Sequence, residues 1–250
     1  MPPIIHCVRH AQAYHNLGTP EHNHSLRDPA LTDLGKQQCA ALRAAFPHHA
    51  RVSAVVASPL RRTLWTALLA FGPGVRVVAL PEIQENSGLP CDVGGERGAL
   101  EREFAGLSAA ADLDFALVAD GWNVKAGPWA AEAGAVAERC RRARVRLREM
   151  VGEGEEGEVV AVTHGGLLHS FTEDWSDFDR HDGTAWANTE FRSYTFAPDG
   201  GEQASLVETE ESLKRRGGTR LTKEDQLKLK RRAEKEWDAL GYQLLSKNPA

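Results

Sequence analysis

The stretch Ile4-Ile5-His6-Cys7-Val8-Arg9-His10 decides the fold. Residues 4–8 are mostly apolar, which is typical of a buried strand, and the basic pair Arg9-His10 follows directly. In open parallel sheets, ligands bind outside the carboxyl ends of the strands. This one stretch therefore predicts a strand of a parallel sheet and a charged site at the end of that strand.

Four further strand-like runs alternate with helical patterns along the chain. These runs span residues 52–57, 75–80, 158–163 and 191–196. A helix is expected over residues 31–46, and another is expected to begin at Ser58, with Ser58 as N-cap and Pro59 in the first turn. The alternation predicts an α/β protein of three layers, in which helices cover both faces of a mostly parallel central sheet.

The 250 residues are 42% hydrophobic and 26% charged, which suffices for one sizeable core. We expect a catalytic domain over residues 1–197, with an irregular insertion at 96–137 that could form a lid. Its Trp and Phe side chains could pack on a substrate or in the core. Residues 198–250 are expected to form a polar linker and a helix over 222–240. That helix is expected to dock on the domain, with partner binding as the alternative.

Charge and cysteine content exclude several classes of function. A net charge of −5 gives no electrostatic reason to expect nucleic acid or an anionic membrane as partner. The four cysteines are scattered without C-x-x-C spacing, which favours a reducing compartment. No signal-peptide pattern or long apolar run is present, so we expect a cytoplasmic protein without membrane contact. A homodimer is left open.

Polar residues follow each of the first four predicted strands. They are Arg9-His10, then Ser58 and Arg62, then Glu82 and Glu85, then His164-Gly165-Gly166. Guanidinium forks match phosphate oxygens, and two histidines supply a candidate nucleophile and a second donor. Gly165-Gly166 brings backbone amides close to an anion at the start of the following helix. The four segments together predict a phosphoryl-binding site.

These motifs resemble the histidine phosphatase, or phosphoglycerate mutase-like, superfamily. The resemblance is carried by Arg9-His10-Ala11 with Asn16, Asp28–Thr32 with Gly35 and Gln38, Ser58–Thr63 with Thr66-Ala67, and Val162–Gly166. It spans roughly residues 4–197, and the pattern RHAQ-x-x-HN is similar to a fungal and plant branch of that family. Ala11 stands where the family usually has glycine, which is tolerated if this position does not need a positive φ.

The resemblance implies a metal-independent phosphatase without cofactor, which hydrolyses a small phosphomonoester through a phosphohistidine on His10. The nucleophile's Nδ1 is then expected to donate to a backbone carbonyl. The implied phosphate-binding residues are Arg9, Asn16, Arg62, His164 and Gly165. The general acid is Glu85 or Glu82, and the step Ile83-Gln84-Glu85 better resembles the family pattern, which favours Glu85. Arg62 occupies the family position, which leaves Arg61 as a surface or supporting charge.

Two other readings stay open. A phosphoglycerate mutase would transfer the phosphoryl group instead of hydrolysing it. A non-catalytic module would use the same pocket to bind a phosphorylated ligand. The sequence does not identify the physiological substrate.

Overall fold

A computed structural model of the chain describes residues 3–19, 23–72, 74–107, 112–151, 157–179 and 184–243. Its strands are β1 (Ile4–Arg9), β2 (Val52–Ala57), β3 (Val77–Ala79), β4 (Leu113–Asp114), β5 (Glu158–Thr163), β6 (Phe191–Phe196) and β7 (Leu206–Glu208). Its α-helices are α2 (Asp33–Ala45), α3 (Arg61–Phe71), α4 (Arg97–Phe104), α5 (Ala133–Val151), α6 (Gly165–Thr172), α7 (Glu210–Arg216) and α8 (Lys223–Ala239).

All seven strands join one sheet in the order β4-β3-β2-β5-β1-β6-β7. The strands from β4 to β1 are mutually parallel, while β6 runs antiparallel to both β1 and β7. In the register, Arg9 lies opposite Thr163 and Ala57 opposite Val162. The carboxyl ends of β1, β2 and β5 therefore meet at one edge of the sheet.

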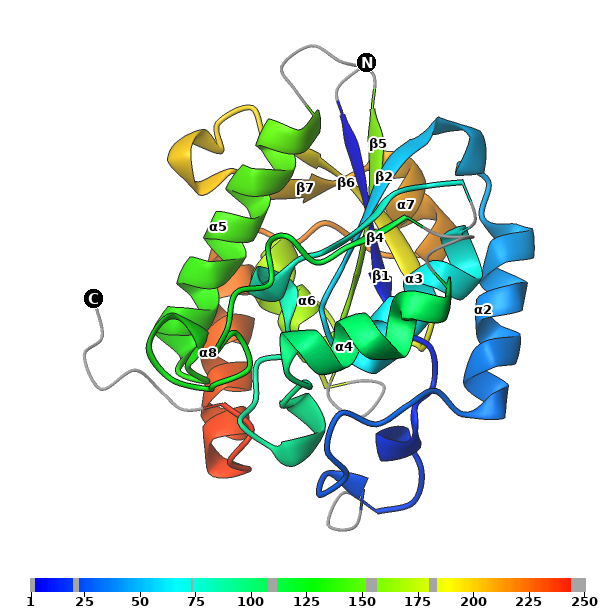
Figure 1. Cartoon of the computed structure of the whole chain (residues 1–250). Coiled ribbons are helices and arrows are strands. Elements are labelled where there is room, and N and C mark those ends of the chain that lie inside the picture. The colour runs from blue at the N-terminus through cyan, green and yellow to red at the C-terminus, as the bar shows by residue number, and fades with distance from the viewer. Residues whose placement is uncertain are drawn as a thin grey trace.

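Helices cover both faces of this sheet (Figure 1). One buried cluster joins α2, α3 and α4 to one face through residues such as Val8 and Val162. A second cluster joins α5 and α6 to the other face through residues such as Cys7 and Ala161. Neighbouring residues of a strand point to opposite faces, and both faces are apolar here. The predicted three-layer α/β/α fold is confirmed.

The predicted start of the second helix is wrong. Helix α3 begins at Arg61 with Leu60 as its N-cap, three residues after Ser58. The amide of Arg61 donates to Oδ1 of Asp28 at 2.9 Å, so a carboxylate distant in sequence caps the helix. The Ser58 hydroxyl is used elsewhere, because it lies 2.8 Å from Nε2 of His164.

The segments outside the predicted strands add to the same core. In the expected insertion, Phe104, Phe115 and Trp122 are buried against the face that α2 and α3 cover. Of the two expectations for the aromatic side chains, packing in the core therefore holds for these three. Short strands β4 and β7 and helices α4 and α7 were not expected from the sequence. The 96–137 lid and the division at residue 197 stay predictions.

Helix α8 packs on the end of α6 through its apolar stripe. Ala233 and Trp237 are buried against Trp175 and Phe178, with Leu229 at the margin. The sequence predicted a stripe of Leu229, Ala233, Trp237 and Leu240. Its middle two residues are buried against the chain itself, whereas Leu240 is 62% exposed. Within the described ranges, no helix combines the length and the apolar character that crossing a bilayer requires.

Candidate active site

His10 lies at the carboxyl end of β1, between two other histidine rings. Its ring centroid is 5.3 Å from that of His164 and 5.3 Å from that of His15. His10 is buried, and its Nδ1 lies 2.8 Å from the carbonyl oxygen of Ala11. This is the expected contact of Nδ1 with the backbone, and a proton on Nδ1 leaves the lone pair on Nε2.

All three histidines favour the neutral form. Burial is the largest cause that lowers the pKa of His10 well below 6.5, and the charges of Arg62 and Arg9 lower it further. Burial and then Arg62 also lower the pKa values of His15 and His164 well below 6.5. Because a neutral imidazole carries the lone pair that a nucleophile needs, the cluster suits nucleophilic attack by His10.

The start of α2 fixes the loop that follows β1. Thr32 accepts a hydrogen bond from the amide of Gly35 and donates from Oγ1 to Oε1 of Gln12 at 2.8 Å. Oε1 of Gln38 accepts from the amide of Gln12, also at 2.8 Å. A Cβ at Gly35 would come within 2.1 Å of the Gln12 carbonyl oxygen, so only glycine allows this approach. These motif residues therefore act by holding the main chain beside His10.

Ala11 and Asn16 lie on the same loop, and a separate prediction was made for each. Ala11 is absent from the positive-φ residues of the described chain, so alanine fits here without strain, and its amide donates to Oγ1 of Thr66. Asn16 lies partly buried next to the histidines, with Nδ2 at 3.3 Å from Nε2 of His15. Its Oδ1 accepts from the amide of Ala13 at 3.0 Å, which leaves the Nδ2 group as the donor available to a phosphoryl oxygen.

Arg9 and Gly165 both contact the loop before β6. Nη1 of Arg9 donates to Oγ1 of Thr184 at 3.0 Å and to the carbonyl oxygen of Trp186. A Cβ at Gly165 would lie 2.5 Å from the Cβ of Thr184. Gly165 is therefore required for the close approach of this loop, and its predicted role in phosphate binding stays a prediction.

Arg62 is fully buried and is held by a carboxylate. Its Nη2 pairs with Oδ1 of Asp92 at 2.8 Å, and its Nη1 donates to the Cys91 carbonyl oxygen at 2.6 Å. Nε of Arg62 has no partner among the described residues. Arg61 instead pairs with Glu103 at 2.8 Å on the surface, as expected for the adjacent guanidinium.

The Glu85 carboxylate lies at the N-terminus of α6. Oε1 accepts from the amides of Leu167 at 2.8 Å and Asn86 at 2.9 Å, and Oε2 accepts from the amide of Gly166 at 3.3 Å. The sequence predicted that this helix start binds an anion, and here its amides donate to the Glu85 carboxyl group, so the phosphate contact stays a prediction. Burial, followed by the charge of Asp92, raises the pKa of Glu85, which is the direction that a general acid requires.

Glu82 points toward a different element. Its Oε1 lies 3.5 Å from Nη2 of Arg146 on α5. The Glu85 side chain therefore reaches the start of α6, which directly follows His164, whereas the Glu82 side chain faces α5. This placement favours Glu85 as the acid, and its catalytic role stays a prediction.

Sequence reasoning missed four charged or titratable side chains of the site, of which Asp92, the partner of Arg62, is described above. Nζ of Lys125 donates to the Glu85 carbonyl oxygen at 2.9 Å, and burial, with Arg139 next, lowers the pKa of Lys125 to about 7. Arg139 of α5 is buried against the same loop. No sequence signal marks these two, because they lie far from Glu85 along the chain. His15 lies inside the quoted RHAQ-x-x-HN pattern and could have been found there.

Three side chains of types that can bind metal ions lie together at the amino edge of the sheet, opposite the histidine cluster. Within the described ranges, ligand atoms of His6, His48 and Glu158 lie within 4.8 Å of one another. Nε of Arg51 pairs with the Glu158 carboxylate at 2.6 Å, so a protein cation already balances its charge. This group is at the amino ends of β1 and β5, away from His10. The metal-independence of catalysis stays a prediction.

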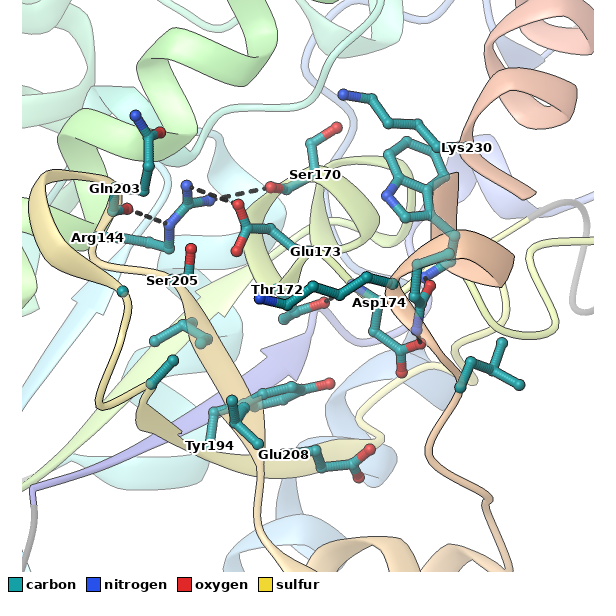
Figure 2. A pocket seen from close by; sticks show the side chains of 18 of the residues that line it. Arg144, Ser170, Thr172, Glu173, Asp174, Tyr194, Gln203, Ser205, Glu208 and Lys230 are labelled. Carbon is teal, nitrogen blue, oxygen red and sulfur yellow. Dashed lines mark hydrogen bonds and ion pairs between the residues drawn. The ribbon is translucent and has the colours of Figure 1, made fainter. Parts of the chain in front are cut away.

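A cavity of about 870 Å³ lies between α5, the end of α6, the β6–β7 hairpin and α8 (Figure 2). Its charged side chains are largely paired with one another or with the backbone. Arg144 contacts Glu173 and the Gln203 carbonyl oxygen, and Arg216 bonds Asp174. None of the residues predicted for the phosphoryl site lines this cavity. The candidate active site is therefore the histidine cluster.

Comparison with known proteins shows what the chain is similar to as a whole. A family model described as "Histidine phosphatase superfamily (branch 1)" matches residues 5–209. The Arabidopsis thaliana protein "Phosphoglycerate mutase-like protein 1" is 38% identical over 76 residues, which is 27% of this chain and 27% of that protein. The matched stretch is thus about a quarter of the plant relative's length.

Solved structures share the fold at low sequence identity. The ecdysone phosphate phosphatase from Bombix mori, in complex with tungstate, has a TM-score of 0.52 and 13% identity, over 83% of this chain and 92% of that one. The YhfR protein of Bacillus stearothermophilus has a TM-score of 0.50 and 14% identity, over 83% and 95%. These likenesses concern the fold alone.

Proposed function

The chain belongs to the histidine phosphatase superfamily (branch 1), and from this premise we propose that it hydrolyses a small phosphomonoester through a phosphohistidine on His10. One observation carries the proposal. His10 is a buried imidazole whose Nδ1 is engaged by the Ala11 carbonyl, whose low pKa keeps it neutral, and whose pKa responds to the charges of Arg62 and Arg9. That combination suits an in-line attack on phosphorus by Nε2.

In the first step, Nε2 of His10 bonds to phosphorus as the ester P–O bond breaks. Arg9, Arg62, Asn16 and His164 would hold the equatorial oxygens and stabilise their negative charge. Nε of Arg62 has no partner among the described residues, so it remains a donor for a phosphoryl oxygen. The phosphoryl dianion also raises the proton affinity of neighbouring groups, which favours a protonated Glu85. Its proton passes to the leaving oxygen, and the alcohol departs.

In the second step, the Glu85 carboxylate accepts a proton from a water molecule. The water oxygen bonds to phosphorus as the His10 N–P bond breaks. Inorganic phosphate leaves, His10 is neutral again, and Glu85 is protonated for the next cycle. No group outside the chain, apart from water and substrate, is needed to balance either step.

His10→Ala tests the proposal. We expect the variant to fold, because the ring is at a strand end, and to lose turnover of p-nitrophenyl phosphate together with acid-labile phosphate on the protein. The matched control is His49→Ala, since the His49 ring bonds the Arg43 carbonyl oxygen and lies in the turn just before β2, at the amino edge of the sheet. Substantial hydrolysis by folded, contaminant-free His10→Ala would reject the nucleophile. Wild-type protein that never carries acid-labile phosphate would favour the non-catalytic binding module.

The plant relative's name supports a second candidate, a mutase that transfers the phosphoryl group to another hydroxyl. Both reactions share the phosphohistidine step, so only its acceptor distinguishes them. Phosphoglycerate interconversion, measured with and without a bisphosphate primer, separates the two. Primer-dependent interconversion that outpaces phosphate release would identify the mutase.

A further inference from the structure

We propose that Arg139, assisted by Lys125, is a positioning residue that holds the general acid Glu85 in register. The inference rests on the proposed function and extends it to two residues outside the family motifs quoted above. Neither residue is placed on the reacting atoms. They act through the main chain of the loop that carries Glu85.

Side-chain donors hold every carbonyl group from residue 82 to residue 85. Nη1 of Arg139 donates to the Glu82 carbonyl at 2.9 Å and to the Gln84 carbonyl at 2.5 Å. Nη2 of Arg139 donates to the Glu85 carbonyl at 3.0 Å, and Nζ of Lys125 donates to the same oxygen at 2.9 Å. Oγ1 of Thr163 donates to the remaining carbonyl, that of residue 83, at 2.7 Å.

The loop needs these donors because it lies beyond the sheet. Strand β3 ends at Ala79, so the carbonyls of residues 82–85 have no strand neighbour, and buried carbonyls without donors are costly. The guanidinium fork binds three of them from two nitrogens in one rigid plane, whereas an ammonium group directs its three donors tetrahedrally from a single atom. The loop is thereby fixed relative to α5, the helix that supplies Arg139.

The position of Arg139 is unusual for a purely structural cation. Its side chain is fully buried, and within the described part of the chain no salt bridge joins it to a carboxylate. Burying a guanidinium costs free energy unless its donors are used. Here both Nη groups donate to the main chain of one loop, while Nε has no partner among the described residues. The consequence of that arrangement is the register, in which Glu85 reaches the α6 amides and Glu82 faces Arg146.

Kinetics with two leaving groups tests the inference. Arg139→Met should slow hydrolysis of an alkyl phosphate such as glycerol 2-phosphate by about 10²-fold, and that of p-nitrophenyl phosphate less than about 10-fold, because only the alkoxide needs the acid. Arg139→Lys, which keeps the charge and some donors, should lose less. Adding Arg139→Met to Glu85→Gln should cause little further loss on the alkyl ester, since both changes remove the same contribution.

A second readout does not depend on turnover. In the His10→Ala background, the amide NMR signals of Gly166 and Leu167, which bond Glu85, should move in Arg139→Met toward their positions in Glu85→Gln. Arg146→Met is the control on the same helix and should leave signals and leaving-group selectivity unchanged. Unmoved amides in folded Arg139→Met, or fully additive losses with Glu85→Gln, would overturn the positioning role. So would a loss of leaving-group selectivity in Arg139→Lys that is larger than in Arg139→Met. If wild-type protein hydrolyses neither ester, the proposed function fails, and the amide shifts still decide this inference.

Discussion

At the scale of single residues, the motifs predicted which side chains meet and could not predict what holds them. Arg9 and His10 at the end of β1, Arg62 on α3 and His164 after β5 lie together as expected, because the parallel strands that precede them end at one edge. Asp92 and Lys125 were missed, since nothing in the spacing of residues distant in sequence reports a contact. These contacts depend on how the loops fold, and the sequence motifs do not specify the loop conformation.

The choice between Glu85 and Glu82 is a prediction at this scale. Glu85→Gln should slow hydrolysis of an alkyl phosphate by roughly 10²–10⁴-fold, the usual contribution of a general acid, and spare p-nitrophenyl phosphate far more. Glutamine keeps an acceptor for the Leu167 amide, so the fold should be retained. Steady-state kinetics on both esters measures the selectivity.

Glu82→Gln is the matched control for that experiment. Its carboxylate faces Arg146 at 3.5 Å, an interaction distant from the histidine cluster, so both substrates should be turned over at nearly the wild-type rate. A selective loss in Glu82→Gln, with Glu85→Gln unaffected, would show that the loop adopts the other register during catalysis.

At the scale of elements, long periodic segments were predictable and short ones were not. The strands at 52–57, 158–163 and 191–196 match the expected bounds, because each is a continuous apolar or alternating run. The two-residue strand β4 and the three-residue strand β7 carry too little pattern to be recognised. The start of α3 was misplaced for another reason, namely that its cap, Asp28, comes from outside the local sequence.

Helix α8 gives a prediction about stability. Trp237 is 6% exposed and packs against Trp175 and the ring of His169 on α6, with ring centroids 5.8 Å and 6.0 Å away. Trp237→Ala should lower the free energy of unfolding by about 3 kcal/mol and the Tm by roughly 6–12 °C, while turnover at 25 °C stays within a few-fold of wild type. Thermal unfolding followed by circular dichroism measures the shift.

Leu240, which follows the same helix, is the control for this experiment. It is 62% exposed, so Leu240→Ala should change the Tm by no more than a degree or two. Loss of turnover in folded Trp237→Ala would show that the tail supports the active site directly. An unchanged Tm would mean that α8 does not dock in solution.

At the scale of the whole molecule, the two edges of the sheet carry different groups of side chains. The carboxyl edge gathers the histidines and guanidinium groups of the candidate active site, which the family motifs anticipated. The amino edge gathers His6, His48 and Glu158, which bring β1, β5 and the turn after α2 together. His6 lies inside the first predicted strand, but its partners, distant along the chain, could not be named from the sequence.

That amino edge leads to a prediction about acid stability. Burial is the main cause that lowers the pKa of His6 to about 4, against 6.5 in the unfolded chain, although its hydrogen bond to Glu158 opposes the shift. Because the folded state disfavours the proton, His6 contributes no penalty above pH 6.5, and stability falls as the pH drops from 6.5 toward 4. A shift of this size corresponds to about 3 kcal/mol. In His6→Phe, the free energy of unfolding, measured with urea at pH 7, 6 and 5, should therefore fall less steeply than in wild type, even if the variant is less stable at pH 7. Equal slopes in the two proteins would mean that other buried histidines cause the acid sensitivity.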